Sequence, residues 1–490
     1  MSLYNKEFNA FDYFIGRKKY SEDLCMIDTM GETVTYKDFY QRVKFKDQEL
    51  FNKFNSNVRC LFILNDCIDL VELFYGALSK NAISGIIPYS LEPCKIIKIL
   101  NRDKYNLIVT DVEKSKSILE ILKTHNNIFK QVKIHNLVFI YINKICSALP
   151  QNSFIIYSSG STGLPKGILH KQIDMKYATD TYGKNILKLS NKDLVYPLSS
   201  ISYGFSFTTA TFQVFEAGAA VLISSNHNTF KIIDTIQQYK PTILCGVPSI
   251  FSMLLKIHTH IANIDLTSVK FVLSSGENLN STIMNSWNKI FNIPLIEGYG
   301  SVEMLTNVIS NTRSVRISGS AGKIVKGFSY RIDNKGILII KGNCISTYEM
   351  GKDNLSQITN IFYTKDVFSL DKNGYFWYNG RIDDKFKFNG IWLNPIDIEK
   401  EFLNISSAHD CYIVKHNKDL YLFYKSSNNL NKSELKDIYF KLREKFVHSI
   451  CPTIFVRVED FKYNHNGKKI RLFFKKNRWT DVEKVADMRK

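Results

Sequence analysis

The sequence predicts an α/β protein with a large N-terminal domain and a small, mobile α+β C-terminal domain. The chain has 490 residues, of which 44% are hydrophobic and 13% aromatic, enough for about three compact units of ~150 residues each. Strand-like and helix-like segments alternate through its first part, and short β-rich pieces follow from about Gly327. We therefore expect an N-terminal domain over 1–380, a hinge at 381–383 and a C-terminal domain over 384–490.

The N-terminal domain should contain two doubly wound lobes of parallel sheet. An apolar run at 58–64, a helical pattern at 70–80 and a second apolar run at 83–88 indicate a strand, a helix and a strand. Short links between such segments favour parallel βαβ units. The same order of patterns recurs over 105–112, 219–223, 242–255 and 269–273.

The region after Gly327 is expected to add a small β-barrel to this domain. Its β-rich pieces are separated by Asn, Gly and Asp turns, and the turn at 371–374 is typical of a hairpin. The mixed patterns beyond Gly380 predict the small α+β domain. The β-rich pieces lie at 330–332, 336–341, 367–370 and 375–378.

The net charge of +19 favours polyanionic partners, but it does not indicate nucleic acid. Lysines are spread along the whole chain, no nucleic-acid-binding motif is present, and the Lys, Ile and Asn bias fits an AT-rich genome. The expected anions are ATP, coenzyme A or an acidic carrier protein. The nine cysteines are scattered without zinc spacing, and no stretch of ~18 apolar residues occurs. We expect a cytoplasmic protein with reduced thiols and no membrane span.

The segment 157–167 carries the strongest functional signal. It holds three hydroxyl residues, three glycines and a lysine, and it follows the apolar run 154–156. Free backbone N–H groups in a glycine turn, together with hydroxyls and a lysine, form a cradle for phosphate oxygens. The usual phosphate loop is excluded, because Pro165 precedes Lys166 and Gly167 stands where a Ser or Thr should bind magnesium. The alternative is a polar surface linker, which rarely lies between apolar segments.

Two further turns follow predicted strands, where ligands bind in open α/β sheets. In the turn 297–303, Tyr299 could stack on adenine and Glu303 could hold magnesium. In the turn 274–277, backbone groups at Gly276 and Glu277 could contact the adenine edge. The structural alternative for each is an ordinary glycine turn with a solvated carboxylate.

Two charged segments lie in the last third of the chain. Asp366 could accept hydrogen bonds from ribose hydroxyls, and Arg381 could bind phosphate or ribose. The run 380–390 falls where the sequence pattern changes, as expected of a hinge between domains. A lysine in the glycine turn at 464–471 could reach into the site of another domain. The alternatives are a solvated loop and a basic tail.

In order and spacing, these segments resemble the acyl-adenylate-forming superfamily of AMP-dependent synthetases and ligases over essentially the whole chain. The resemblance is greatest to benzoate–CoA ligases and related aryl-CoA ligases, on the stretches 157–170, 201–204, 300–305 and 389–395. It implies an acid–thiol ligase that forms an acyl-AMP with release of pyrophosphate and then a thioester. The implied cofactors are ATP, Mg²⁺ and coenzyme A.

The resemblance also implies roles for individual residues. Lys468, Glu303 and Thr162 would be catalytic, with Glu303 as the metal ligand, Asp383 as the hinge, and Lys387 and Gly390 serving the thiol step. The ATP-binding set would comprise Ser158, Ser159, Gly160, Ser161, Thr162, Gly163, Lys166, Gly276, Glu277, Tyr299, Gly300, Ser301, Asp366 and Arg381. Lys469 follows Lys468, and we favour Lys468 because it comes directly after a glycine.

The acid pocket is expected at Tyr203, Gly204, Gly298 and Thr306. An aromatic acid such as a substituted benzoate is favoured, with an aliphatic acid second. The stretch 199–207 contains no acid to pair with the ammonium group of an α-amino acid, which would be costly to bury alone. The alternative acceptor to coenzyme A is the phosphopantetheine of an acyl carrier protein. A non-catalytic nucleotide-binding protein is the remote alternative.

Overall fold

The computed structural model describes residues 8–488 apart from 47, 126, 144–148, 159–163, 262, 353–358, 409, 417, 427–429, 460 and 462–483. The chain divides into two compact units, each described separately below. The first unit comprises 1–330, 339–362 and 374–376, and the second comprises 331–338, 363–373 and 377–490.

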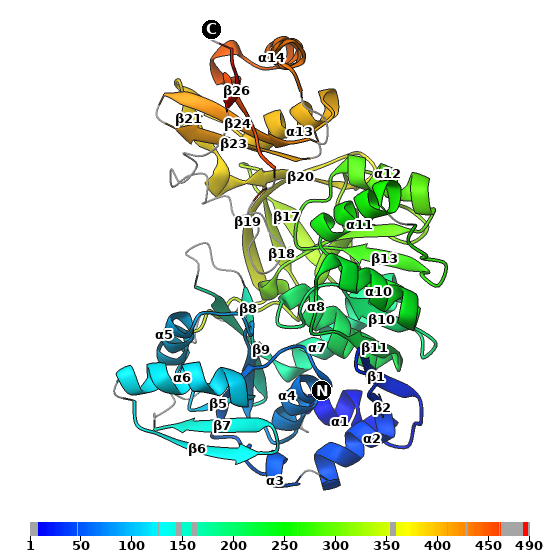
Figure 1. The fold of residues 1–490 in the computed structure, drawn as a ribbon, viewed down its shortest axis with the longest axis vertical. Helices are drawn as coiled ribbons and strands as arrows, with labels where there is room; N and C mark the ends of the chain where they lie inside the picture. Colours follow the sequence, from blue (N-terminus) through cyan, green and yellow to red (C-terminus); the bar gives the residue numbers. More distant parts are fainter. Residues whose placement is uncertain are drawn as a thin grey trace. The chain divides into compact units, whose positions relative to one another are not determined.

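The first lobe of the first unit is a seven-stranded sheet of order β6-β7-β5-β3-β4-β8-β9 (Figure 1). Its central strands β5, β3, β4 and β8 are parallel, and the flanking strands are antiparallel. The strands are β3 (Arg59–Ile63), β4 (Ile83–Ile86), β5 (Leu107–Asp111), β6 (Phe129–Ile134), β7 (Leu137–Ile142), β8 (Ser153–Ser158) and β9 (Lys166–Lys171). The helices that follow β3, β4 and β5 are α4 (Ile68–Ser79), α5 (Pro93–Asp103) and α6 (Val112–Thr124).

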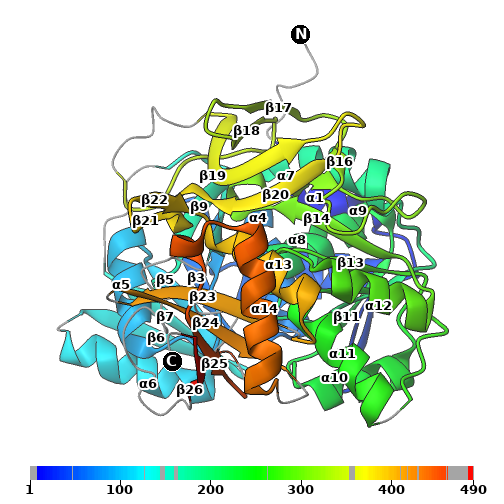
Figure 2. The same ribbon diagram turned by 90° about the horizontal axis from the view of Figure 1, so that it is seen from above.

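The second lobe is a nine-stranded sheet of order β16-β15-β14-β13-β12-β10-β11-β1-β2. The strands from β14 to β1 are parallel, and β2, β15 and β16 are antiparallel. They are β1 (Leu24–Asp28), β2 (Thr33–Thr35), β10 (Leu194–Pro197), β11 (Ala220–Ile223), β12 (Ile243–Gly246), β13 (Phe271–Ser274), β14 (Leu295–Gly300), β15 (Asn307–Ser310) and β16 (Lys323–Ile324). Figure 2 shows helices α10 (Thr229–Tyr239), α11 (Pro248–His260) and α12 (Ser281–Phe291) side by side.

Apolar side chains explain why both sheets form. All five residues of β3 are buried, as expected for a central strand covered on both faces. In the second lobe, Trp287 of α12 packs edge-on against Phe251 of α11 at the centre of a buried cluster. The α/β class with parallel-sheet lobes is therefore confirmed.

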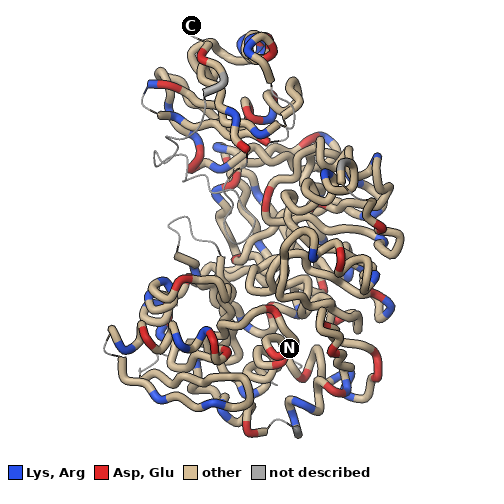
Figure 3. The backbone as a smooth tube through the Cα atoms, in the orientation of Figure 1, with Lys and Arg blue, Asp and Glu red and all other residues tan. Residues whose placement is uncertain are grey.

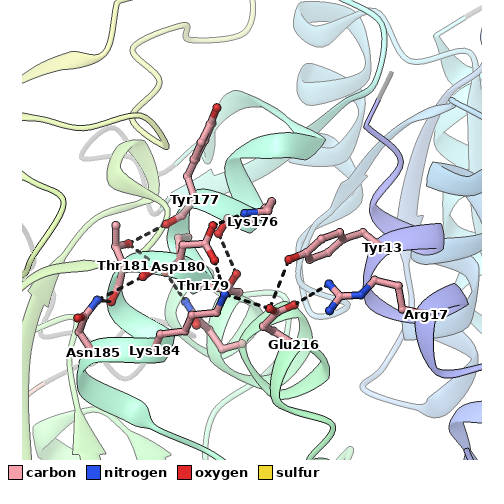
Figure 4. Close-up of polar contacts among 12 residues, drawn as sticks. Tyr13, Arg17, Lys176, Tyr177, Thr179, Asp180, Thr181, Lys184, Asn185 and Glu216 are labelled. Carbon is pink, nitrogen blue, oxygen red and sulfur yellow. Dashed lines mark hydrogen bonds and ion pairs between the residues drawn. The ribbon is translucent and has the colours of Figure 1, made fainter. Parts of the chain in front are cut away.

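A polar network fixes the helical segment that joins the lobes (Figure 4). The hydroxyl of Tyr13 donates to Glu216 at 3.3 Å, and Lys184 lies 3.5 Å from the same carboxylate and 2.6 Å from Asp180. The π-helix η3 that carries Asp180 and Lys184 is thereby tied to the first helix. The elements of this region are α1 (Ala10–Phe14), η1 (Gly16–Lys18), α2 (Tyr36–Gln41), η2 (Arg42–Lys46), α3 (Gln48–Phe51), α7 (Gln172–Ala178), η3 (Thr179–Leu187), α8 (Gly204–Thr208), η4 (Thr209–Gln213) and α9 (Val214–Ala217).

A four-stranded sheet of order β17-β18-β19-β20 has residues assigned to each unit. In the turn before β20, Asn373 donates its backbone N–H to the Asp371 side chain at 2.9 Å, and Gly374 has a φ of +81°. The small β-barrel expected here stays a prediction. The strands are β17 (Ser329–Ile332), β18 (Ile337–Lys341), β19 (Ile361–Leu370) and β20 (Phe376–Arg381).

The second unit has the α+β composition that the sequence predicts. Its main sheet has the order β23-β24-β25-β26, and its apolar core includes Phe402 of α13 and Leu435 of α14. The elements are η7 (Ile382–Asp384), β21 (Phe386–Phe388), β22 (Ile391–Leu393), α13 (Pro395–Ile405), β23 (Asp410–His416), β24 (Asp419–Lys425), α14 (Lys432–Lys445), η8 (His448–Ile450), β25 (Ile454–Arg457) and β26 (Lys484–Asp487). The domain and hinge boundaries at 380 and 383 stay predictions.

Charge and cysteine placement agree with the expectations from the sequence. Lys and Arg are spread along the tube in Figure 3 and form no single block in the described part of the chain. The eight cysteines in the described ranges are all free thiols. Among the helices described here, none is both long enough and apolar enough to cross a membrane.

Candidate nucleotide and acid site

The two stems of the predicted phosphate loop are adjacent antiparallel strands. β8 pairs with β9 so that Ser158 faces Lys166 and Tyr157 faces Gly167. A Cβ on Gly167 would lie 2.9 Å from Ile155 and 3.0 Å from Tyr157, so only glycine fits there without displacement. The structure thus places Ser158 and Lys166 at the two ends of the loop. The other predicted loop residues lie outside the described residues: Ser159, Gly160, Ser161, Thr162 and Gly163.

The first stem is anchored by a buried carboxylate that sequence reasoning missed. The Tyr157 hydroxyl donates to Asp103 Oδ2 at 2.6 Å and lies 2.9 Å from the Tyr105 hydroxyl. Asp103 is completely buried and accepts from both Arg102 Nε at 2.5 Å and Nη2 at 2.8 Å. Burial, with the neighbouring Tyr105 and Asp103, raises the pKa of the Tyr157 phenol well above its usual value. Tyr157 therefore remains a hydrogen-bond donor that holds the loop root.

The second stem carries an ion pair. Lys166 Nζ lies 2.9 Å from Glu349 Oε2, and Lys352 Nζ lies 2.8 Å from the same oxygen. Burial alone would raise the pKa of Glu349, but the hydrogen bonds and charges of Lys352 and Lys166 outweigh it and hold this pKa below its usual range. Glu349 is therefore a carboxylate shared by two ammonium groups.

Residues 298–300 are predicted to form a glycine turn, but they are the end of strand β14, where the two glycine positions leave no room for a Cβ. A Cβ on Gly298 would lie 2.3 Å from Asn307 Nδ2, and one on Gly300 would lie 2.3 Å from the Thr306 carbonyl oxygen. β14 and β15 are antiparallel, which brings Thr306 and Asn307 alongside these glycines. The structure thus gathers Gly298, Gly300 and Thr306, three of the predicted site residues.

Asn307 links these glycines to the predicted adenine-edge segment. Ser275 Oγ donates to Asn307 Oδ1 at 2.8 Å, and Asn307 Nδ2 donates to the Tyr182 hydroxyl at 3.1 Å. All three side chains are buried, and burial raises the pKa of Tyr182 to about 12. Gly276, with a φ of +89°, and Glu277 directly follow Ser275. A chain of hydrogen bonds therefore joins 274–277, 298–307 and η3.

Glu303 is suited to a divalent cation. It lies in the short 3-10 helix η5 (Val302–Met304), and its carboxylate has no hydrogen-bond or ion-pair partner among the described residues. The hydroxyl of Ser301 is buried and also has no partner in the described part of the chain. Within that part, no three His, Cys, Asp or Glu side chains form a metal cluster. Glu303 is thus a residue that could hold Mg²⁺, which in nucleotide sites is commonly bound by one or two carboxylates together with phosphates.

The predicted acid-pocket residues lie beside the end of β14 and η5. A Cβ on Gly204 would lie 2.9 Å from Val302 Cγ2, so the start of α8 packs closely against η5. Tyr203 is half-buried, and burial together with Asp66 raises the pKa of its phenol well above the usual value. Thr306 is buried, with Oγ1 at 3.5 Å from Gln213 Nε2. Gly204, which directly follows Tyr203, thus stands next to Val302, the residue that precedes Glu303.

An acid does reach the stretch 199–207, from a distant part of the chain. Asp66 accepts hydrogen bonds from Ser200 Oγ and Ile201 N, both at 2.8 Å, and His227 Nε2 lies 3.0 Å away. The stretch itself contains no acid, as the sequence shows, but the Asp66 carboxylate approaches it from another part of the chain. Its bonds hold the backbone turn and leave Asp66 poorly placed to receive a substrate ammonium group.

The second unit brings together its own predicted site residues. Arg381 Nη1 lies 3.3 Å from Asp366 Oδ1, and Asp366 is buried. Lys365, with a φ of +64°, places its ammonium 3.2 Å from Asp383 in η7. These contacts group a carboxylate and a guanidinium beside the predicted hinge residue.

The predicted thiol-step residues lie on a hairpin of the same unit. Lys387 of β21 faces Trp392 of β22, and Gly390, with a φ of +83°, lies in the connecting turn. Lys387 and Trp392 are both exposed. Lys468 and Lys469 lie outside the described residues.

The fold and the clustered residues define a nucleotide-binding α/β protein, and comparison with known proteins places it further. The AMP-binding enzyme family matches residues 16–346. The chain belongs to this family.

Curated relatives and solved structures agree with that placement. The chain is 25% identical over 369 residues to 3-hydroxybenzoate–CoA ligase of Aromatoleum sp. (strain CIB), covering 70% of each protein. It is 28% identical over 281 residues to benzoate–CoA ligase of Thauera aromatica, covering 53% of this chain and 52% of the relative. A crystal structure of an anthranilate CoA ligase with anthranoyl-AMP superposes with a TM-score of 0.82 at 20% identity, over 96% of this chain and 97% of that chain. A benzoate CoA ligase from Burkholderia xenovorans LB400 gives a TM-score of 0.80 at 18% identity, over 95% and 99%. These structures show the same fold.

Proposed function

We propose that the chain activates an aromatic carboxylic acid with ATP and transfers the acyl group to coenzyme A. One geometric observation carries this proposal. Gly204, at the acid side, packs against Val302, the residue before Glu303. An acid held beside Tyr203 and a nucleotide held at Glu303 would therefore meet at one place. Several curated relatives are named aryl-CoA ligases, and these names support the same chemistry.

The first half-reaction would join the acid to AMP. A carboxylate oxygen attacks the α-phosphorus of ATP, the bond to the bridging oxygen breaks, and pyrophosphate leaves. Ser158 and Lys166 stand at the loop ends, where they can hold the β- and γ-phosphates. Glu303 would hold Mg²⁺, which supplies charge stabilisation when bound. Lys468 would stabilise the charge shifting onto the bridging oxygen.

The ribose would be bound by a carboxylate and a guanidinium that lie side by side. Asp366 can accept hydrogen bonds from ribose hydroxyls, and Arg381, at 3.3 Å, both orients that carboxylate and offers donors to the nucleotide. The adenine would lie against Tyr299 and the backbone at Gly276 and Glu277. These assignments extend the family resemblance to this chain residue by residue.

The second half-reaction would form the thioester. The coenzyme A thiolate attacks the acyl carbonyl, the bond to the phosphate oxygen breaks, and AMP leaves. A rotation about Asp383 would withdraw Lys468 and present Lys387 and Gly390, since one site cannot easily accommodate both steps.

The acid favoured by the site is aromatic, with an aliphatic acid second. Tyr203 and the bare backbone of the glycines at 298 and 300 suit a flat ring. Asp66 is engaged by Ser200, Ile201 and His227, so a substrate α-ammonium would lack a partner there. A substituted benzoate therefore fits better than an α-amino acid.

The acceptor can be tested directly. Purified enzyme, ATP, Mg²⁺ and a benzoate panel are incubated either with free coenzyme A or with a phosphopantetheinylated carrier protein, and thioesters are identified by mass spectrometry. We expect aryl-CoA from free coenzyme A. If thioester is found only on the carrier protein, the acceptor is a carrier protein and not coenzyme A. Acyl-AMP without any thioester would contradict the ligase proposal.

A further inference from the structure

The most informative cluster outside the assigned residues surrounds Glu349. Two ammonium groups form ion pairs with one oxygen of Glu349. Lys166 Nζ lies 2.9 Å from Oε2, and Lys352 Nζ lies 2.8 Å from the same atom. The Glu349 side chain is 19% exposed, whereas Lys166 is 42% and Lys352 67% exposed. The carboxylate is therefore sheltered, and both lysines are open to an incoming anion.

Backbone bonds fix this cluster on the phosphate-loop stem. Glu349 forms a β-bridge with Ile168, and the backbone N–H of Met350 donates to the Gly167 carbonyl at 2.8 Å. Gly351 packs so closely on Arg102 that a Cβ would lie 2.4 Å from Arg102 Cγ. The segment that carries Glu349 and Lys352 is therefore held to both roots of the loop.

The charges of the two lysines are only partly balanced by Glu349. Two lysines and one glutamate sum to one net positive charge beside a loop that must receive a multiply charged anion. In this cluster, both ammonium groups share a single carboxylate oxygen of Glu349. Adjacent phosphoryl groups would offer them several oxygens and more negative charge. A pyrophosphate moiety would therefore compete with Glu349 for both lysines.

We propose that Lys352 is a second binding residue for the β- and γ-phosphates of ATP and for the pyrophosphate product, and that Glu349 is the counter-ion both lysines exchange for it. Lys166 and Lys352 then turn from the shared carboxylate oxygen to phosphoryl oxygens. This inference rests on the proposed ATP-dependent function. It extends that function by assigning Lys352 and Glu349, which lie outside the 157–167 motif.

The test is calorimetric titration of the full chain with magnesium pyrophosphate, with no acid present. Lys352→Ala should weaken pyrophosphate binding about three- to tenfold, because one charge-assisted contact is lost. Glu349→Gln should strengthen binding, because the competing carboxylate is removed while its shape is kept. Lys166→Ala serves as the reference for a lost loop contact.

Matched controls come from α10 of the same unit. Lys231 and Asp234 form an i,i+3 ion pair at 3.5 Å, and both side chains are 63% exposed. Lys231→Ala and Asp234→Asn therefore remove equivalent surface charges away from the loop, and both should bind pyrophosphate like the wild type. The KM for coenzyme A should be unchanged in Lys352→Ala. This result would show that Lys352 binds the pyrophosphate leaving group and not the phosphates of coenzyme A.

The inference is overturned if Lys352→Ala binds pyrophosphate as tightly as Lys231→Ala does. It is also overturned if Glu349→Gln weakens binding as Lys166→Ala does, because Glu349 would then position Lys166. Absence of wild-type pyrophosphate binding overturns it as well. If the binding pattern is seen but no acid is activated, the proposed function fails, and only the pyrophosphate-binding role of Lys352 and Glu349 stands. If the wild type forms thioester and the variants bind equally, this inference alone fails.

Discussion

The hydroxyl of Tyr157 donates a 2.6 Å hydrogen bond to the carboxylate of Asp103, which is completely buried. Tyr157 immediately precedes Ser158, the last described residue before the centre of the phosphate loop. Arg102 holds the same carboxylate through two nitrogens. The root of the loop therefore depends on a buried network that makes no contact with substrate in our assignment.

The first prediction concerns this anchor. Tyr157→Phe should raise the KM for ATP several-fold while leaving the KM for the acid near the wild-type value, because only the loop loses its support. Removing the hydrogen bond should lower the free energy of unfolding by about 1–3 kcal/mol. Steady-state kinetics and urea unfolding provide the two measurements.

Tyr36→Phe is the control for this anchor. The buried Tyr36 hydroxyl donates to the Ala219 carbonyl at 2.7 Å in the same unit. Its loss should destabilise the fold comparably without changing the KM for ATP. Equal effects of Tyr157→Phe and Tyr36→Phe on that KM would refute a specific role in loop positioning.

The second prediction concerns the packing of Gly298 against Asn307. Gly298→Ala forces a methyl group to within 2.3 Å of Asn307 Nδ2, and should cost about 1–3 kcal/mol. Asn307→Ala removes the amide that hydrogen-bonds the buried hydroxyls of Ser275 and Tyr182, and should cost about 1–3 kcal/mol. In the double variant, the methyl group occupies space that the amide has left.

The double variant should therefore lose at least ~0.5 kcal/mol less than the sum of the single variants. Denaturant unfolding of the four proteins measures this coupling. Strict additivity would show that the close contact between Gly298 and Asn307 does not limit stability.

The third prediction concerns ribose recognition by Asp366. The wild type should prefer ATP over 2′-deoxy- and 3′-deoxy-ATP, and Asp366→Asn should lose much of that preference, because the amide is a poorer acceptor than the carboxylate. Arg381→Ala should reduce it too, since Arg381 lies 3.3 Å from this carboxylate. The measurement is kcat/KM for each nucleotide.

Asp371→Asn provides the control in the same unit. Asp371 accepts a 3.2 Å hydrogen bond from Trp377 Nε1 and has no assigned substrate contact. It should leave nucleotide preference intact. An Asp366→Asn enzyme that still discriminates against deoxy nucleotides like the wild type would remove Asp366 from the ribose site.

The fourth prediction separates the two half-reactions. Lys468→Ala should lose adenylation by orders of magnitude, because charge on the bridging oxygen is no longer stabilised. It should still convert supplied acyl-AMP and coenzyme A to thioester. Lys469→Ala should retain adenylation. Full adenylation by Lys468→Ala, with loss in Lys469→Ala, would transfer the role to Lys469.

Local patterns in the sequence were sufficient to predict the lobes. The helix expected at 70–80 is α4 (Ile68–Ser79), and the strands expected at 58–64 and 83–88 are β3 and β4. Apolar periodicity and strand-terminal glycines are local signals, so they could be recognised without a structure. Ser158 ends β8 and Lys166 begins β9, as the apolar runs on either side of the loop predicted, whereas 298–300 proved to be the end of β14.

The supporting contacts could not be predicted, because they join residues far apart in the chain. Asp66 is 134 residues from Ser200, and Asp103 is 54 residues from Tyr157. No local pattern marks these carboxylates, because Asp103 is simply the last residue of α5 and Asp66 lies in the bend between β3 and α4. Asn307 carried a weak signal, because it follows the two glycines on a returning strand. Only the folded sheets bring such groups together.

The most direct test of the central claim is ATP–pyrophosphate exchange, measured with labelled pyrophosphate across a panel of carboxylic acids. Exchange should require Mg²⁺ and the acid, should be strongest with a substituted benzoate, and should be absent with α-amino acids. Failure of every acid in the panel to support exchange, or exchange that does not depend on added acid, would contradict the central claim.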